Sequence, residues 1–173
     1  QINPICDVTA IEEFIDADNV AALVTPGRFD YVIDAIDDAR AKTALIVHCR
    51  EHQIPLLTIG SAGGQTDPTR IAVTDLARTE QEPLLKRVRK NLRLRHGFPR
   101  GTKVKFGIDA VYSMEPLRLP EVCEADGSDT DGDAVGVTGL NCAGYGSAMV
   151  VTASFGLVAA AHVLRKIAAK MQS

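Results

Sequence analysis

The sequence predicts a single α/β domain, spanning residues 1–173, in which helices flank a mainly parallel sheet. Three observations support this fold class. Residues 31–36 are apolar and largely β-branched, which indicates a buried strand. An Ala-rich helical pattern follows over residues 38–53, and a second apolar run covers residues 55–60. A strand, a helix and a strand at this spacing form one parallel βαβ unit.

The composition is that of one globular domain. With 173 residues the chain can bury a substantial core, and 46% hydrophobic and 24% charged residues are ordinary for such a domain. The four cysteines lie far apart, and no C-x-x-C pair is present. This pattern argues against a thiolate zinc site and against a secreted disulfide scaffold. Free thiols fit a reducing compartment, so we expect a cytoplasmic protein.

The remaining elements follow from alternation, helical spacing and capping residues. Residues 6–13 alternate as a strand would, and the polar residues 16–19 can cap a short helix. Leu84, Val88 and Leu92 recur at core spacing within a helix. We therefore expect a strand at 6–13, a helix at 20–24, a loop at 61–68, a strand at 70–75, a helix at 80–95 and a strand at 102–112.

The carboxyl-terminal third combines an acidic loop with a long helix. Residues 114–141 predict an irregular connection that contains a purely acidic stretch, and residues 144–173 predict a long helix. Residues 143–164 contain no Asp, Glu, Lys or Arg, so by length they could cross a bilayer. Their Gly, Ala, Ser and Thr content favours a buried helix near a subunit interface instead, and we expect no membrane partner. Cys142 is either a reactive thiol or a small buried hydrophobe.

The amino-terminal end lacks two features. The chain opens with Gln1 and Ile2, without a Met, a basic n-region or an apolar h-region, so we expect no signal peptide in this stretch. No Gly-rich phosphate loop precedes residue 31 either. We expect that an amino-terminal Gly-rich βαβ portion is missing from this chain.

Asp37 is the first candidate for chemistry. It follows a buried strand, and open α/β sheets bind ligands beyond the carboxyl ends of their strands. There it could hold the magnesium ion of a nucleoside triphosphate. Alternatively, Asp37 or Asp38 simply caps the next helix. Asp34 lies within the strand and must find a partner, so we expect a structural role for it. Lys42 could contact phosphate or could be an ordinary solvated helix residue.

Residues 60–64, Gly-Ser-Ala-Gly-Gly, form a weak candidate for a phosphate loop. They lack the lysine of the P-loop motif, and Asp67 and Pro68 follow where a helix would be needed. We interpret this segment as a backbone turn beside the site, which a ligand could approach closely at Gly60 and Gly63.

A purely basic stretch between Lys86 and Lys105 predicts a surface for RNA or another polyanion. The alternative is a solvated helix face whose bases the helix dipole favours near its carboxyl end. The helix dipole accounts for a few basic residues near the carboxyl end, but not for a stretch of this length that has many bases and no acid. The nucleic-acid candidates are Lys86, Arg87, Arg89, Lys90, Arg93, Arg95 and Lys103.

Several segments, taken together, resemble one protein family. Residues 2–4, 18–20 and 31–42 are similar to the ThiF/MoeB/HesA branch of the ubiquitin-activating superfamily. Four further segments narrow the resemblance to the tRNA threonylcarbamoyladenosine dehydratase (TcdA/CsdL-type) subfamily. These segments are residues 55–69, 73–79, 111–115 and 142–147.

The resemblance implies a Rossmann-like ThiF-type fold, usually homodimeric, and an ATP-dependent enzyme. It implies that ATP activates the carboxylate of threonylcarbamoyladenosine in tRNA, and that the ureido oxygen then closes a ring. The implied cofactors are ATP, Mg²⁺ and a monovalent cation near the Gly60 loop, and the implied partners are tRNA and a sulfur-transfer protein. Asp37 is implied as the catalytic and metal-binding residue. The implied nucleotide contacts are Phe14 at the adenine, Asp37, Asp38, Lys42, Gly60 and Gly63.

Two other functions remain open at this point. Relatives that adenylate a sulfur carrier or ubiquitin-like protein share these motifs, but many of them carry paired C-x-x-C zinc ligands, which this chain lacks. A non-catalytic binding domain is the third reading. The family's phosphate turn, ribose acid and ATP-binding bases would all precede Gln1, so we expect this chain alone to bind ATP weakly and to be inactive.

Overall fold

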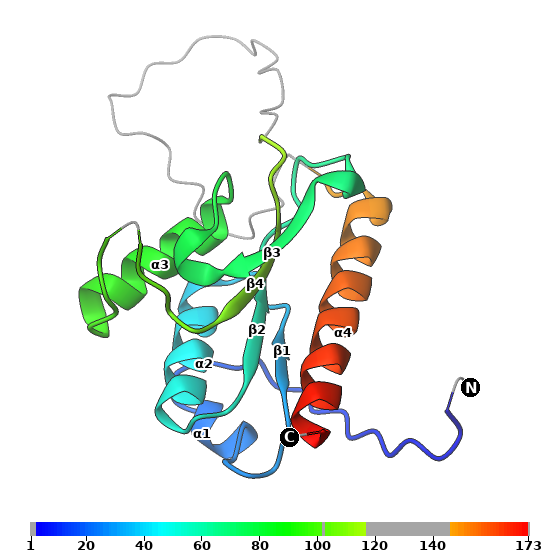
Figure 1. The fold of residues 1–173 in the computed structure, drawn as a ribbon. Coiled ribbons are helices and arrows are strands. Elements are labelled where there is room, and N and C mark those ends of the chain that lie inside the picture. The colour runs from blue at the N-terminus through cyan, green and yellow to red at the C-terminus, as the bar shows by residue number, and fades with distance from the viewer. Residues whose placement is uncertain (1–2, 102, 117–145, 173) are drawn as a thin grey trace, which may run out of the picture.

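A four-stranded sheet with helices on both faces forms the body of the molecule (Figure 1). The computed structural model describes residues 3–101, 103–116 and 146–172. The elements in chain order are α1 (Val20–Leu23), β1 (Val32–Asp34), α2 (Ala39–Glu51), β2 (Leu56–Ile59), η1 (Pro68–Arg70), β3 (Ile71–Asp75), η2 (Leu76–Arg78), α3 (Pro83–Arg95), β4 (Asp109–Ser113) and α4 (Met149–Met171).

The sheet has the strand order β1-β2-β4-β3, so β1 and β3 are its edges in the described part of the chain. β1 pairs with β2 in parallel, with Asp34 opposite Thr58, and β2 pairs with β4 in parallel. β3 runs antiparallel to β4. The predicted βαβ unit and the mainly parallel sheet are therefore confirmed, and the carboxyl ends of β1 and β2 meet at one edge.

Alternation along the strands divides the apolar side chains between two cores. Leu56 packs with residues of α1, α2 and α3 on one face, whereas Leu57 and Ile59 pack against α4 on the other. From α4, Val151 and Phe155 complete this second core. Figure 1 shows the same division, with α4 alone on its side of the sheet.

Two predicted strands differ from the structure. Residues 6–13 form no strand, and Val8 and Ile11 are exposed, because no neighbouring strand among the described residues pairs with this stretch. The strand predicted at 102–112 is confined to β4, and Phe106 reaches the core from an irregular segment. Alternation alone cannot provide a hydrogen-bonding partner, so it overestimated both strands.

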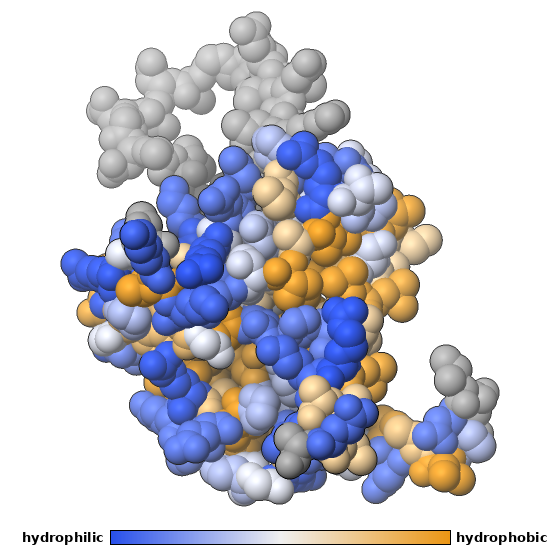
Figure 2. Space-filling view, in the orientation of Figure 1, coloured by the Kyte–Doolittle hydropathy of each residue, from blue (hydrophilic) through white to orange (hydrophobic). Residues whose placement is uncertain are grey.

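The long carboxyl-terminal helix is half exposed rather than buried. Only one stripe of α4 is buried, while Met149, Val150, Leu157 and Leu164 face solvent. Figure 2 shows hydrophobic side chains gathered over this helix. In the described residues, α4 is the one helix long and apolar enough to cross a membrane. The predicted acidic loop, together with Cys142, lies almost entirely outside the described residues.

Candidate functional site

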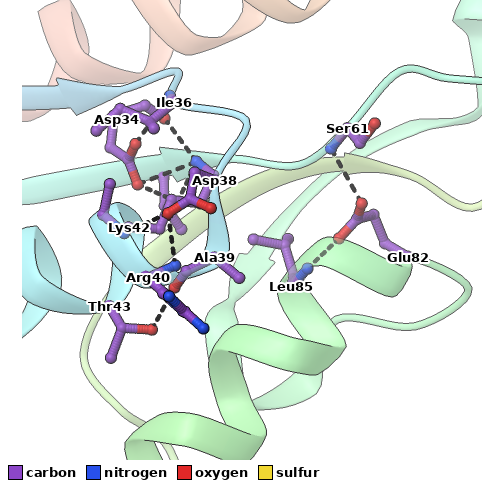
Figure 3. Close-up of polar contacts among 12 residues, drawn as sticks. Asp34, Ile36, Asp38, Ala39, Arg40, Lys42, Thr43, Ser61, Glu82 and Leu85 are labelled. Carbon is purple, nitrogen blue, oxygen red and sulfur yellow. Dashed lines mark hydrogen bonds and ion pairs between the residues drawn. The ribbon is translucent and has the colours of Figure 1, made fainter. Parts of the chain in front are cut away.

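A buried ion pair joins the carboxyl ends of β1 and β2. Lys42 and Asp34 are 0% and 1% exposed, and Lys42 Nζ lies 3.0 Å from Asp34 Oδ2 (Figure 3). The same ammonium donates to the Asp34 carbonyl oxygen at 3.3 Å and to Thr58 Oγ1 at 3.1 Å. Thr58 in turn donates its hydroxyl to Asp34 Oδ2 at 2.7 Å. One lysine from α2 thereby fixes both strand ends.

This arrangement changes the interpretation of Lys42. Burial lowers the pKa of its ammonium, and the charges of Asp34, Glu82 and Asp37 partly offset that effect. Lys42 is not a solvated helix residue, so that alternative is wrong. Its side chain is fully buried and positions the ends of β1 and β2. Contact of Lys42 with a nucleotide stays a prediction. The structural role expected for Asp34 is confirmed.

The loop between β1 and α2 presents two further carboxylates. Asp38 is the helix cap, since its Oδ1 accepts the backbone N–H groups of Arg40 at 2.9 Å and Ala41 at 2.7 Å. Asp34 at the end of β1 also stabilises the loop, because its Oδ1 accepts the N–H of Ile36 at 3.0 Å. Asp37 is half-buried between Ile36 and Asp38. Capping is therefore assigned to Asp38, and Asp37 stands at the carboxyl edge, as its sequence position predicts.

A cavity of about 700 Å³ opens beside this loop. Its lining brings together Phe14, Ile36, Asp38 and Arg40, from two segments far apart in the sequence. The Phe14 ring is 97% exposed at its rim, which leaves its face open to a flat ligand. Of the predicted nucleotide contacts, Phe14 and Asp38 thus share one cavity. Asp37, Lys42, Gly60 and Gly63 are not among the residues that line it.

Gly60 leaves room for a neighbouring side chain. A Cβ at this position would lie 3.0 Å from Cγ and 3.1 Å from Cδ of Glu82. Glu82 is 3% exposed, accepts the N–H of Ser61 at 3.0 Å and caps α3 through Leu84 and Leu85 (Figure 3). Burial raises the pKa of Glu82, although these hydrogen bonds oppose the rise. Glu82 thus gives a structural reason for Gly60, and the approach of a ligand there stays a prediction.

A second buried carboxylate fastens the other end of the same loop. Glu115 Oε2 accepts the N–H groups of Thr66 and Asp67, each at 2.9 Å. Between these anchors, Gly63 is buried and forms an isolated bridge with Ser147. Sequence reasoning missed both Glu82 and Glu115. Glu82 could have been found, since an acid directly before the proline of a helix start is a typical cap.

The basic residues of α3 divide into two groups. Lys86, Arg87, Lys90 and Arg95 are exposed, and Figure 2 shows hydrophilic side chains gathered over this helix. The other two are engaged internally. Arg89 donates to the hydroxyl of Thr79, and the Arg93 guanidinium lies 5.3 Å from the centre of the Phe106 ring. Lys103 is exposed on the irregular segment after the helix. The structure therefore leaves a smaller cationic surface than the sequence suggests.

Comparison with known proteins identifies relatives of one function. The chain is 47% identical over 173 residues to the tRNA threonylcarbamoyladenosine dehydratase of Escherichia coli (strain K12), covering 98% of this chain and 63% of the relative. The Haemophilus influenzae dehydratase is 44% identical over 170 residues, covering 98% of this chain and 62% of the relative. The chain thus spans less than two thirds of the length of these relatives.

Solved structures agree with this relationship. The crystal structure of E. coli tRNA N6-threonylcarbamoyladenosine dehydratase in complex with ATP superposes with a TM-score of 0.81 at 44% identity, covering 99% of this chain and 60% of that one. The complex of the same enzyme with AMP gives the same TM-score and identity. Residues 1–173 match the ThiF family throughout. With its Rossmann-like mixed sheet and its carboxyl-edge acids, this chain belongs to the ThiF family.

Proposed function

We propose that the protein containing this chain uses ATP to dehydrate threonylcarbamoyladenosine in tRNA. The observation that carries the proposal is the 47% identity to the E. coli dehydratase along 98% of this chain. Relatives of the same description in H. influenzae and Bacillus subtilis support it. The dehydratases of E. coli and H. influenzae each match 98% of this chain, so we retain the dehydratase function over activation of a sulfur carrier.

The chemistry explains the need for ATP. A carboxylate is a poor electrophile until one of its oxygens becomes part of a leaving group. In the proposed reaction the substrate carboxylate attacks the α-phosphorus of ATP and pyrophosphate leaves. The ureido oxygen then attacks the activated carbonyl carbon, and AMP leaves as the ring closes. The first step brings two anions together, so positive charge near the phosphates lowers its barrier.

Magnesium bound together with ATP is the cation that we propose for this site. They contain no group of three or more His, Cys, Asp or Glu side chains able to hold a metal on their own. Mg²⁺ bound to a nucleotide typically needs only one or two carboxylates, because phosphate oxygens and water complete its coordination. Asp37 and Asp38 would supply these carboxylates, and the bound ion would offset the triphosphate charge. The monovalent cation near Gly60 stays a prediction.

We also propose two binding partners, tRNA and a second copy of the protein. The exposed bases of α3 support tRNA binding, and the exposed apolar residues Met149, Leu157 and Leu164 on α4 support a homodimer through that face. A cytoplasmic location follows from the tRNA substrate, and the free thiols of Cys6 and Cys49 fit it. A sulfur-transfer partner and the absence of a membrane partner stay predictions.

The test uses the protein in its full encoded length. It is incubated with ATP, Mg²⁺ and tRNA that carries threonylcarbamoyladenosine, and the nucleosides are then analysed by mass spectrometry. We expect conversion to a product lighter by one water, dependent on ATP and strongly reduced by Asp37→Ala. Pyrophosphate release stimulated only by a sulfur-carrier protein, with no change in the tRNA nucleoside, would refute the proposal.

A further inference from the structure

A groove of about 530 Å³ runs along the outer face of α2. It extends from Arg40 in the first turn of α2 to His52, just beyond the last. α1 forms one wall, and the last turn of α3, with Asn91 and Arg95, forms the other. We call this feature the α2 groove. The cavity of about 700 Å³ beside the loop between β1 and α2 is called the carboxyl-edge cavity below. The α2 groove is separate from it but adjoins it, because Arg40 lines both.

The chemistry of the α2 groove suits a polyanion that carries flat rings. Arg40 and Arg95 stand at its rims, and Arg95 belongs to the exposed basic group of α3. Glu51 is the one acid among the residues that line it. Arginine is well suited to phosphate because its planar fork can donate two parallel hydrogen bonds. The floor includes Val47 and other small apolar side chains, which offer a surface for a base rather than for water.

A fixed ring pair lies within the groove. His48 is 7% exposed, and its Nε2 lies 2.7 Å from the carbonyl oxygen of Val24. The His52 ring packs beside it at a tilt of 51°, with centroids 4.5 Å apart, and His52 is exposed. An aromatic ring held in place by a buried neighbour is the kind of platform on which single-stranded bases stack.

We propose that the α2 groove binds a single-stranded segment of RNA, with phosphates on Arg40 and Arg95 and a base against His52. The inference deepens the proposed function, since the RNA would be the tRNA substrate. It follows from continuity, because the groove joins the carboxyl-edge cavity to the basic end of α3. A loop of RNA could thus extend from α3 toward the site along one path.

The experiment measures binding of an unmodified, fluorescently labelled tRNA transcript to the full-length protein by anisotropy at several salt concentrations. Arg95→Glu is compared with Arg165→Glu, an identical charge reversal at an exposed position of α4, on the opposite face of the sheet. We expect Arg95→Glu to weaken binding on the order of tenfold and to lower the slope of log affinity against log salt by about one. Arg165→Glu should leave both values unchanged. Melting temperature and elution volume confirm that each variant is folded and of native size.

A second variant tests the stacking role. His52→Ala should weaken binding on the order of tenfold while the salt slope stays native, because a ring contact releases no counterion. Native affinity in both groove variants, an equal loss in Arg165→Glu, or displacement of the tRNA by poly-glutamate as effectively as by unlabelled tRNA would overturn the proposal. The binding test and the activity test can also disagree. If the groove variants lose tRNA binding but the native protein does not cyclise the modified nucleoside, the proposed function is refuted and the groove assignment stands.

Discussion

Two ion-pair clusters lie on opposite faces of the sheet and differ in their access to water. On the face covered by α2, the ion pair of Lys42 and Asp34 is sealed from solvent. On the face covered by α4, Asp109 begins β4 and lies 2.8 Å from His162 Nε2 and 3.2 Å from Lys166 Nζ. The Lys166 side chain is 55% exposed. Each cluster joins a helix to the sheet, one through α2 and the other through α4.

This difference in exposure indicates which of the two ion-pair clusters stabilises the candidate site. A buried charge that loses its partner is stranded in a medium of low polarity, whereas an exposed one is rehydrated. The sealed cluster therefore holds the two strand ends in one arrangement, and the exposed one contributes little beyond its packing. Four substitutions compare buried polar groups with the more exposed cluster. They are given below in order of decreasing expected effect.

The largest effect is expected for Lys42→Met. It leaves the Asp34 carboxylate buried without its cation, which should lower the free energy of unfolding by about 3–5 kcal/mol in urea titrations. The double variant Lys42→Met, Asp34→Asn should recover part of this loss, because no charge is then stranded. A loss below 1 kcal/mol for the single variant would contradict the assignment of a buried ion pair.

Glu82→Ala should have the next largest effect. It removes the cap of α3 and leaves the N–H of Ser61 without its acceptor, so we expect a loss of about 2–3 kcal/mol in the same titration. Glu82→Gln keeps the side-chain shape and one acceptor oxygen, and it should lose less. Equal losses in the two variants would argue against the hydrogen bonds as the cause.

Gly60→Ala should destabilise the protein by about 1–3 kcal/mol, because its Cβ meets Glu82. In the Glu82→Ala background the same change should cost much less, since the two closest atoms are gone and Leu85 Cδ1, at 3.3 Å, remains. A double-mutant cycle measures this coupling. Additive losses would show that Gly60 is needed for another reason, such as approach of a ligand.

The smallest effect is expected for the cluster of Asp109, His162 and Lys166 on the α4 face. Asp109→Asn should lower the free energy of unfolding by less than about 1 kcal/mol. Burial alone would raise the pKa of Asp109, but hydrogen bonds from His162 and Lys166 hold it below the ordinary value of 3.8. A lowered carboxyl pKa stabilises the fold above pH 3.8, and this contribution is lost as the pH falls through the folded pKa. The difference between native and variant proteins should therefore shrink below pH 3.8.

Local pattern was sufficient for most of the fold. The βαβ unit follows from apolar runs and a helical period that are both continuous in the sequence, and the structure confirms it. The strand at 6–13 failed because a strand needs a partner that sequence alternation does not specify. Within this chain α4 is buried along one stripe only, because composition cannot tell which of its apolar residues the sheet covers. The subunit interface expected near α4 stays a prediction.

The site was only partly predictable. The position of Asp37 at a strand end could be inferred, because the carboxyl edge is defined by the βαβ unit itself. Burial of Lys42 could not, since it depends on Thr58 of the next strand and on the depth at which α2 packs. The spatial neighbour of Gly60 is Glu82, 22 residues further along the chain by their numbers. No short-range pattern reports such a contact.

The sheet order has a practical consequence for handling this chain. Among the residues that the structure describes, β1 is an edge strand, and Ile33 on it is 45% exposed. An uncovered edge offers a row of backbone donors and acceptors to any other extended chain. In concentrated preparations of this polypeptide by itself, β1 should therefore recruit strands from other copies, and light scattering that rises with concentration would reveal it. A charged residue at position 33 should suppress this self-association without altering the core.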